Sequence, residues 1–486
     1  MSSTAGSGRS GHQRRVLAVA VLGSFVAILD GSVVNLALPA IGRELGGGLA
    51  AQQWIVDAYL LTLGALILVA GSLSDLFGRV RILQWGLLGF AAMSVLCGFA
   101  VTDTMLIAGR ALQGVFGALL VPSSLALIIS EFSGREQSKA IGQWTAWTGA
   151  STIVAPLIGG AAVDLLSWRF VFFVNLLPVL VSLPLLRSLR AGDAPRDPSI
   201  RLDIPGAVLA VVGLGGSVFA LIEQGRFGWT SPLVLLPLII GVAALAGFVA
   251  HERRSPVPMM PLVLFRVRNF SAGNVATLAI YGALSLGFFV LTIYLQQVGG
   301  MAAITAGIAL LPATVLLLLL SSRFGALAGK WGPRLFMSAG PAVAGVGFLL
   351  FLALRQPLDY WWMVLPGILV FGLGLAITVA PLTSAILGSV EPSRAGIGSA
   401  INNAVARVAG LVTIAFAGVI VGERLDTDGL HRIALVTALL LFTGAVVSAA
   451  GIRNPGRGAA VEPPSLEPPG AEPPGAGPPG AERGQE

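Results

Sequence analysis

The sequence predicts an all-α integral membrane protein with two pseudo-symmetric six-helix bundles and two additional transmembrane helices. Hydrophobic residues make up 55% of the 486 residues, charged residues only 11%, and the mean hydropathy is +0.86, far above that of a soluble protein. Long apolar runs separated by short basic loops recur along the chain, as in multi-pass helical proteins. A loop motif that begins at Gly71 returns at Gly325, which indicates two related halves.

A helix needs about 20 apolar residues to cross a bilayer, and fourteen segments meet that requirement. Six spans form a first set, two follow, and six form a second set. The predicted spans are residues 16–41, 51–72, 82–101, 104–130, 139–163, 168–187, 204–222, 231–250, 270–296, 304–324, 334–354, 360–388, 396–422 and 432–452.

These spans give a domain plan of five parts, of which the last is a repetitive Pro/Gly-rich segment with no apolar face, predicted to be disordered. The parts are an N-terminal cytoplasmic tail (1–15), a first bundle (16–190), a linker with two extra spans (191–265), a second bundle (266–453) and a cytoplasmic tail (454–486).

The basic residues predict the orientation of the chain. An even number of spans puts both termini on one side of the membrane, and lysine and arginine concentrate on the cytoplasmic side. Of the 30 lysines and arginines, 22 fall on the side of the termini and six on the other, while Arg110 and Arg407 lie within spans. We therefore expect cytoplasmic termini in a bacterial cell membrane. Because the basic residues are scattered, no nucleic-acid partner is expected, and a monomer is predicted.

The acid in "AILDGSVVNLALP" is the strongest functional signal, because Asp30 falls in the middle of the first apolar run. A carboxylate in hydrocarbon is costly and normally faces a bundle interior or a watery cavity. Burial and a neighbouring cation shift the pKa of a carboxyl group in opposite directions, so its charge can change as a cavity opens and closes. All three histidines (His12, His251 and His431) fall in predicted loops or tails, so carboxylates are expected to carry protons.

Two arginines within predicted spans need partners inside the bundle, since guanidinium does not deprotonate. Arg110 lies in the fourth span, where we predict that it tunes Asp30. Arg407 lies in the thirteenth span, and its side chain either has a functional role or is paired structurally.

Several kinds of chemistry are not expected. The sequence has no G-x-x-x-x-G-K-[ST] nucleotide-binding loop, no His/Cys cluster for a metal and no apparent nucleophile and base pair. The single cysteine, Cys97, lies in an apolar run and is interpreted as a packed thiol. We therefore predict a protein that is not an enzyme and that needs neither metal nor cofactor, with a proton gradient as its energy source.

The repeated loop predicts a gate. In "GSLSDLFGRVR", Asp75, Gly78 and Arg79 lie in a tight turn between the second and third spans, where the carboxylate can accept hydrogen bonds from a helix N-terminus and the arginine can pair across the two halves. The alternative is an ordinary basic loop on the cytoplasmic side. "GALAGKWGPR" occupies the equivalent place in the second half.

At these motifs the sequence resembles the major facilitator superfamily, specifically its fourteen-helix drug:proton antiporters. The stretches that carry the resemblance are "LDGSVVNLALP", "GSLSDLFGRVR", "LIAGRALQGVFGALLVPSS" and "WRFVFFVNLLP", in the family's order. The fifth-helix antiporter motif is similar but departs in "GASTIVAPLIGG", where Ala155 stands before Pro156 in place of glycine. The resemblance implies conformational roles for Pro156, Gly159 and Gly160, and an acid of this family matches Asp57 on the second helix.

A central cavity with aromatic faces, a few polar groups and an acid is expected to hold the cargo. Some of the candidates also have a nonfunctional interpretation. Asp57 would then be an interfacial acid in contact with water, and the two tryptophans would face lipid or lie at the interface. The candidate binding residues are Asn35, Asp57, Gln113, Trp144, Trp147, Asn402 and Asn403.

The predicted function is proton-coupled export of drugs or other lipophilic, cationic small molecules by alternating access. Asp30 carries the proton in this scheme, and Arg110 tunes the protonation of Asp30. The alternatives are a symporter, a dedicated exporter of one endogenous metabolite, and a nontransporting membrane receptor or scaffold.

Overall fold

The computed structural model describes residues 4–189, 202–391, 394–422 and 425–454, and within them fourteen helices are long and apolar enough to cross a membrane. This confirms the predicted spans in number and order. The predicted tail from 454 onward lies outside the described residues apart from Asn454, as does most of the linker that precedes the first extra span.

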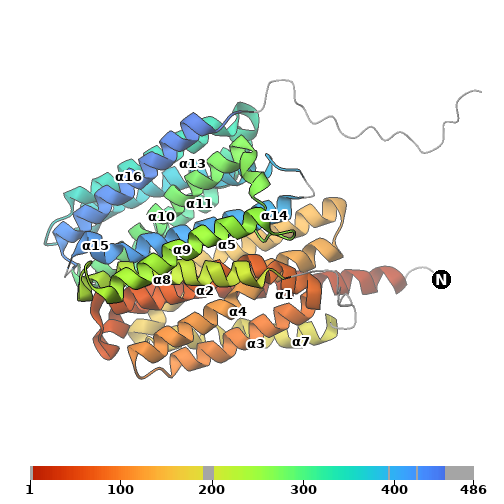
Figure 1. The fold of residues 1–486 in the computed structure, drawn as a ribbon, viewed down its shortest axis with the longest axis horizontal. Helices are drawn as coiled ribbons and strands as arrows, with labels where there is room; N and C mark the ends of the chain where they lie inside the picture. The colour runs from red at the N-terminus through yellow and green to blue at the C-terminus, as the bar shows by residue number, and fades with distance from the viewer. Residues whose placement is uncertain (1–3, 190–201, 392–393, 423–424, 455–486) are drawn as a thin grey trace, which may run out of the picture. The chain divides into compact units, whose positions relative to one another are not determined.

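The first bundle is drawn from red to yellow in the lower part of Figure 1. Its first helix begins before the predicted span, because the helix continues into the tail through the exposed residues Arg14 and Arg15. The helices are α1 (Thr4–Leu45), α2 (Gly48–Phe77), α3 (Arg79–Gly98), α4 (Asp103–Glu131), α5 (Gly134–Leu165), and α6 (Phe170–Phe173) with α7 (Leu176–Leu189), which together make the sixth span.

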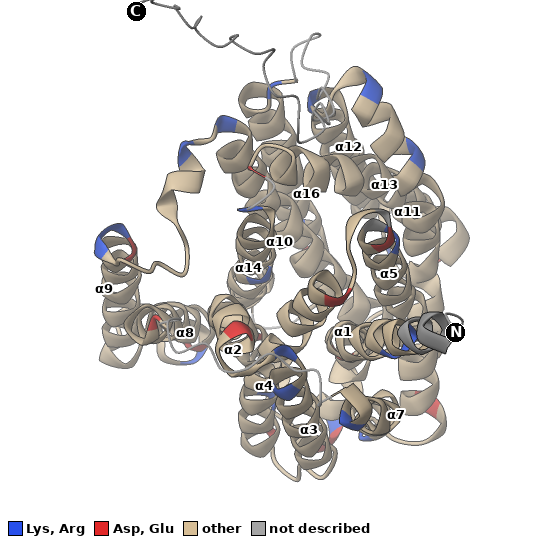
Figure 2. Ribbon diagram, turned by 90° about the vertical axis from the view of Figure 1, so that its right-hand side faces the viewer, with Lys and Arg blue, Asp and Glu red and all other residues tan. Residues whose placement is uncertain are grey.

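The two extra spans, α8 (Ile204–Phe227) and α9 (Pro232–Arg254), lie outside both bundles, with α8 beside α2 and α9 packed on α8 (Figure 2). They pack closely because each has a glycine at the crossing: a Cβ added to Gly216 would lie 2.4 Å from the carbonyl oxygen of Pro237. One hydrogen bond ties α8 to the first bundle, from Trp54 Nε1 to Glu223 Oε1 at 2.9 Å.

The second bundle, green to blue in Figure 1, packs α10, α12, α13 and α16 together, with α11 and α14 at its margins toward the first bundle. Its elements are η2 (Leu262–Arg266), α10 (Arg268–Gln297), α11 (Ala303–Trp331), α12 (Pro333–Leu349), η3 (Leu350–Ala353), η4 (Tyr360–Val364), α13 (Leu365–Leu387), α14 (Ala395–Ala415), α15 (Ala417–Val421) and α16 (Thr427–Gly451).

The two copies of the loop motif have the same backbone device. Gly78 ends α2 and begins α3 with φ 98°, and Gly332 ends α11 and begins α12 with φ 84°. Both values lie in the left-handed region that favours glycine, because a side chain there would clash with the backbone. The sequence repeat therefore marks a structural repeat.

Two helix pairs make the main contacts between the bundles: α5 packs against α11, and α2 packs against α14. We call the end of the bundles that carries the start of α1 and the α2–α3 turn the inner end, and the opposite end the outer end. The inner end is to the right in Figure 1.

Candidate functional site

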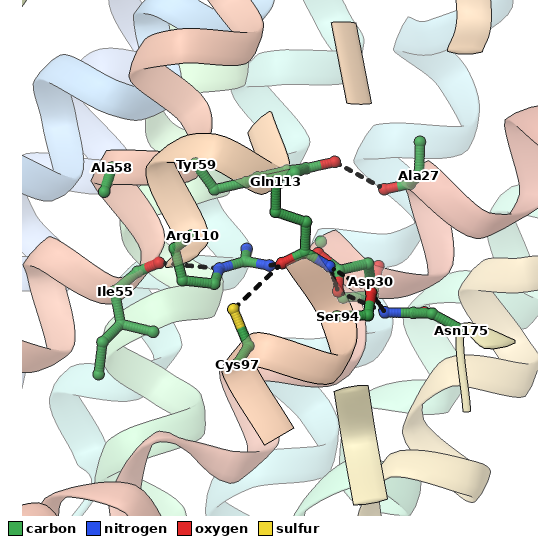
Figure 3. Close-up of polar contacts among 12 residues, drawn as sticks. Ala27, Asp30, Ile55, Ala58, Tyr59, Ser94, Cys97, Arg110, Gln113 and Asn175 are labelled. Carbon is green, nitrogen blue, oxygen red and sulfur yellow. Dashed lines mark hydrogen bonds and ion pairs between the residues drawn. The ribbon is translucent and has the colours of Figure 1, made fainter. Parts of the chain in front are cut away.

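Asp30 lies at the centre of a buried polar cluster in the first bundle (Figure 3). Its side chain is fully buried, and its Oδ2 lies 2.5 Å from Nη1 of Arg110 on α4. Its Oδ1 accepts hydrogen bonds from Asn175 Nδ2 at 2.8 Å and from Gln113 Nε2 at 3.1 Å. The carboxylate therefore has three donors from two other spans.

Arg110 is only 1% exposed and is held from several sides. Besides Asp30, it donates from Nη1 to Gln113 Oε1 at 2.7 Å and from Nε to the carbonyl oxygen of Ile55 at 3.1 Å. Its Cζ lies 4.2 Å from the centre of the Tyr59 ring, within the range of a cation–π contact. The predicted pairing of an intramembrane arginine with the first-helix acid is present in this geometry.

Helix α3 completes the cluster from a third side. Ser94 Oγ accepts from Gln113 Nε2 at 2.8 Å and from Asn175 Nδ2 at 3.3 Å, and Cys97 makes only a long contact to Gln113. The sequence analysis did not single out Ser94 or Asn175. Asn175 was detectable in principle, since it is a lone amide in the apolar stretch "WRFVFFVNLLP".

A cavity of about 370 Å³ lies between the bundles next to this cluster. Arg110 of the polar cluster lines this cavity, and so does Tyr59, which packs against Arg110. Both bundles contribute to the lining, which is mainly apolar. Its polar and charged residues other than tyrosine are Ser32, Asn35, Arg110, Thr152, Ser285, Thr292, Thr314 and Arg407.

Of the predicted binding residues, Asn35 lines this cavity. Its Oδ1 is buried and accepts no hydrogen bond from any described residue. Gln113 lies instead in the buried cluster, where it serves Asp30 and Arg110.

Four other predicted binding residues bond elsewhere or face away from the cavity. Trp144 donates to Ser24 Oγ at 3.0 Å and so ties α5 to α1, and Asn402 donates to Thr277 Oγ1 at 2.8 Å. Asn403 is exposed and bonds back to its own helix, and Trp147 is 63% exposed. The side chains of Trp144, Asn402 and Asn403 thus hydrogen-bond within or between helices, as is usual in membrane bundles.

Asp57 is also absent from the cavity lining among the described residues, although it is fully buried on α2. Neither of its carboxyl oxygens accepts a hydrogen bond from any described residue. The interpretation of Asp57 as an interfacial acid in contact with water is therefore not supported by this conformation. A buried carboxyl group without donors is unusual and marks a functional candidate.

The predicted gate loop does not reach across the bundles in this conformation. Arg79 at the start of α3 pairs with Asp75 in the last turn of α2, at 3.3 Å; Asp75 is exposed and Arg79 is partly exposed. An exposed pair at this spacing contributes little to stability. In place of the expected cross-bundle latch, this conformation has a local contact across the α2–α3 turn, within the first bundle.

Helices of the two bundles meet along a seam, where α5 packs against α11 and α2 against α14. The antiporter-like motif on α5 makes close backbone contacts at this seam and with α1. A Cβ added to Gly159 would lie 2.2 Å from Val33 on α1, and one added to Gly160 would lie 2.4 Å from Ile304 Cα on α11. Gly307 of α11 in turn meets the carbonyl oxygen of Pro156. Small residues thus let the backbones touch.

Two sets of hydrogen bonds close the outer end, and neither set was predicted. Asp164 at the end of α5 accepts from the backbone N–H groups of Ala303 and Ile304, which begin α11. Gln53 on α2 donates to the carbonyl oxygens of Ile414 and Ala415 at the end of α14. Both side chains satisfy backbone groups that helix ends leave unpaired.

The seam widens toward the inner end along both helix pairs. On α5, a Cβ at Gly160 would clash with α11, one at Gly149 would touch Leu318 at 3.8 Å, and one at Gly142 would meet nothing within 4 Å. On α2, a Cβ added to Gly64 would lie 3.3 Å from the Cβ of Arg407. A Cβ added to Gly71 would have no neighbour within 4 Å. The bundles therefore pack tightly toward the outer end and more loosely toward the inner end.

Comparison with known proteins agrees with this architecture. The family model described as Major Facilitator Superfamily matches residues 20–414. The Methylenomycin A resistance protein of Bacillus subtilis (strain 168) is 33% identical over 84% of this chain and 87% of its own length. The Puromycin resistance protein pur8 of Streptomyces alboniger is 36% identical, with 82% and 80% covered.

A multidrug pump and a solved structure extend the comparison. The Multidrug efflux pump LfrA of Mycolicibacterium smegmatis is 32% identical over 83% of this chain and 80% of its own length. The crystal structure of the peptide transporter POT superposes with a TM-score of 0.66 at 17% identity, covering 90% of this chain and 95% of that one. At that identity the likeness concerns the fold alone.

Proposed function

Because the chain belongs to the Major Facilitator Superfamily and is a multi-pass cell-membrane transporter rather than an enzyme, we propose that it exports drug-like small molecules in exchange for protons. Its relatives include antibiotic-resistance proteins and a multidrug efflux pump, which supports drug export. The proton exchange is the part of the proposal that depends on this chain's own residues.

The observation that carries the proposal is the buried pair of Asp30 and Arg110 beside the central cavity. In a low-dielectric bundle, protonation of Asp30 leaves the Arg110 charge without its counter-ion, which is strongly unfavourable unless the surroundings rearrange. A proton on Asp30 therefore favours a different arrangement of the bundle from the one stabilised by the ion pair. Because the protonated and ionised forms of Asp30 favour different conformations, binding and release of a proton can drive a conformational cycle.

We assign the described conformation to the state of that cycle in which the bundles are in contact at the outer end. With the basic loops placed in the cytoplasm, the inner end faces the cytoplasm and the cavity receives cargo from that side. To release cargo outside, the Asp164 and Gln53 contacts must break while the inner ends close. One charge moving across about 100 mV supplies about 2.3 kcal/mol, which is enough to couple the two movements.

The cargo is proposed to be lipophilic, because the cavity wall is mainly apolar. The cationic cargo predicted from the sequence relied on an acid in the cavity. None of the described residues that line the cavity carries a carboxylate. We therefore propose lipophilic cargo without the requirement for a positive charge.

The test is uptake of a fluorescent lipophilic dye into inverted membrane vesicles energised by a proton gradient, from a host without its own pumps. The wild type is expected to accumulate dye and to lose it when an uncoupler is added. Asp30→Asn should abolish gradient-driven uptake, whereas Asp428→Asn, an exposed acid at the start of α16, should not. Undiminished gradient-driven uptake by a well-expressed Asp30→Asn protein would contradict the proposal.

A further inference from the structure

The second intramembrane arginine, Arg407, sits in the wall of the central cavity. It lies near the middle of α14, the helix of the second bundle that packs against α2. Its Cβ is 3.3 Å from the position of a Cβ added to Gly64, so its backbone is fixed at the seam between the bundles. From this seam its side chain reaches the cavity lining.

Arg407 differs from Arg110 in having no hydrogen-bond or ion-pair partner in the part of the chain that the structure describes. Arg110 is 1% exposed and has the Asp30 carboxylate, Gln113 and a backbone carbonyl as acceptors. No described residue accepts a hydrogen bond from Arg407 or forms an ion pair with it, and its side chain is half-buried. An intramembrane guanidinium that stays charged and has no counter-ion normally marks a substrate or ion pathway.

The surroundings of Arg407 do not offset its charge. Of the two charged residues that line the cavity, both are arginines, and Arg110 is already paired. The other polar groups of the wall, apart from Asn35 and Tyr59, are hydroxyls of serine and threonine. The described wall therefore carries one uncompensated positive charge within an apolar surface.

This charge determines which molecules the cavity favours. Like charges repel strongly where the effective dielectric constant is low, so a cation loses affinity near Arg407. A carboxylate, sulfonate or phenolate gains a charge-assisted hydrogen bond, and guanidinium can bind a carboxylate with two parallel bonds. The apolar wall then accommodates the remainder of the molecule.

We propose that Arg407 is the residue that recognises cargo and that the cavity selects amphiphilic organic anions, a lipophilic body carrying one acidic group. This inference rests on the proposed export function and specifies its substrate class. The position of Arg407 at the α2–α14 seam also puts the bound anion beside a contact that changes as the transporter turns outward.

The experiment compares two dyes with the same xanthene chromophore and opposite permanent net charge, sulforhodamine B (anionic) and rhodamine 6G (cationic). Uptake of each into energised inverted vesicles is measured as a function of dye concentration for the wild type, Arg407→Gln, Arg407→Lys and Arg323→Gln. Arg323 is an exposed arginine on α11 outside the cavity lining and serves as the matched control.

The expected result is that the wild type prefers sulforhodamine B. Arg407→Gln should raise the KM for this dye by about tenfold or more, the range for losing a hydrogen bond to a charged group. Rhodamine 6G uptake should stay the same or improve in this variant. Arg407→Lys should recover part of the affinity, because it keeps the charge but loses the planar fork. Arg323→Gln should resemble the wild type.

The outcomes separate this inference from the function on which it rests. If the wild type takes up neither dye in a gradient-dependent manner, export itself is in question. If it takes up rhodamine 6G in preference to sulforhodamine B, or if Arg407→Gln and Arg407→Lys impair both dyes equally, export stands and anion selection is overturned. Should Arg407→Gln fail to fold, the dye preference of the wild type and the KM of Arg407→Lys decide the question.

Discussion

The carboxylate of Asp164 on α5 accepts a hydrogen bond from the backbone N–H of Ile304 at 2.8 Å, so a residue of the first bundle caps the first turn of α11 in the second. Its other oxygen accepts from the neighbouring N–H of Ala303 at 3.0 Å. A helix N-terminus favours negative charge and leaves its first N–H groups unpaired, so this contact satisfies both needs at once. It also exists only while the outer ends of the bundles touch.

Asp164→Ala should weaken the outer closure by about 0.5–2 kcal/mol, the range for the loss of a helix cap. Spin labels at Leu165→Cys and Thr305→Cys, in a Cys97→Ala background, should show a larger population of long distances between α5 and α11. Asp359→Ala is the control, because Asp359 caps η4 within one bundle. Equal distance distributions with and without Asp164 would show that the cap does not hold the outer end.

Gly160→Val should force the outer seam apart, because its Cβ would lie 2.4 Å from Ile304 Cα. Overpacking of a tight contact typically costs about 1–3 kcal/mol, and the lost closure should reduce transport strongly. Gly142→Val, on the same helix with nothing within 4 Å, is the matched control and should retain transport. The measurements are thermal unfolding in detergent and dye uptake, and similar losses in both variants would argue against a seam that widens inward.

Asp30 and Arg110 should be strongly coupled in a double-mutant cycle. Breaking a buried pair by removing one partner costs about 3–5 kcal/mol, since the other charge is left uncompensated. The double variant Asp30→Asn/Arg110→Gln should therefore be less destabilised than the sum of the two single variants, by about 0.5–3 kcal/mol. Unfolding of the purified proteins measures the cycle, and additive effects would mean that the pair is not maintained in the membrane.

Asp75→Asn should change the free energy of unfolding by less than about 1 kcal/mol, because its pair with Arg79 is exposed. If the loop becomes a cross-bundle gate when the inner end closes, the same substitution should nevertheless slow dye uptake severalfold. Glu44→Gln breaks an exposed pair with Arg169 at the other end of the same bundle and is the control. Normal uptake by Asp75→Asn would remove the gating role predicted from the sequence.

The spans were predictable because hydropathy is a local property of the chain. A segment long and apolar enough to cross the bilayer must do so wherever the rest of the chain lies, and all fourteen segments are confirmed. The acid–arginine pair was partly predictable for the same reason: a charge in hydrocarbon needs a partner, and few candidates exist. Asp30 and Arg110 were both identified in this way.

The cavity wall could not be predicted, because a polar residue in a span has several ways to be satisfied. Asn402 bonds to Thr277 on a neighbouring helix and Trp144 bonds to Ser24, whereas Asn35 faces the cavity. The sequence shows the residue type but not the rotation of its helix. The hydrogen bonds of Asp164 and Gln53 that close the outer end could not be predicted either, because the partners of both side chains are backbone groups, which have no sequence signature.

Among the described residues, the side chains that hydrogen-bond to the Asp30 carboxylate all belong to the first bundle, while Arg407, which has no such partner among them, belongs to the second. Under the proposed function, substitutions in the second half of the gene can therefore alter cargo recognition by Arg407 without disturbing the groups around the acid. A lineage facing a new toxin would then keep the half with the proposed proton carrier and diversify the other. Swapping second halves between related pumps is the corresponding route for an engineer.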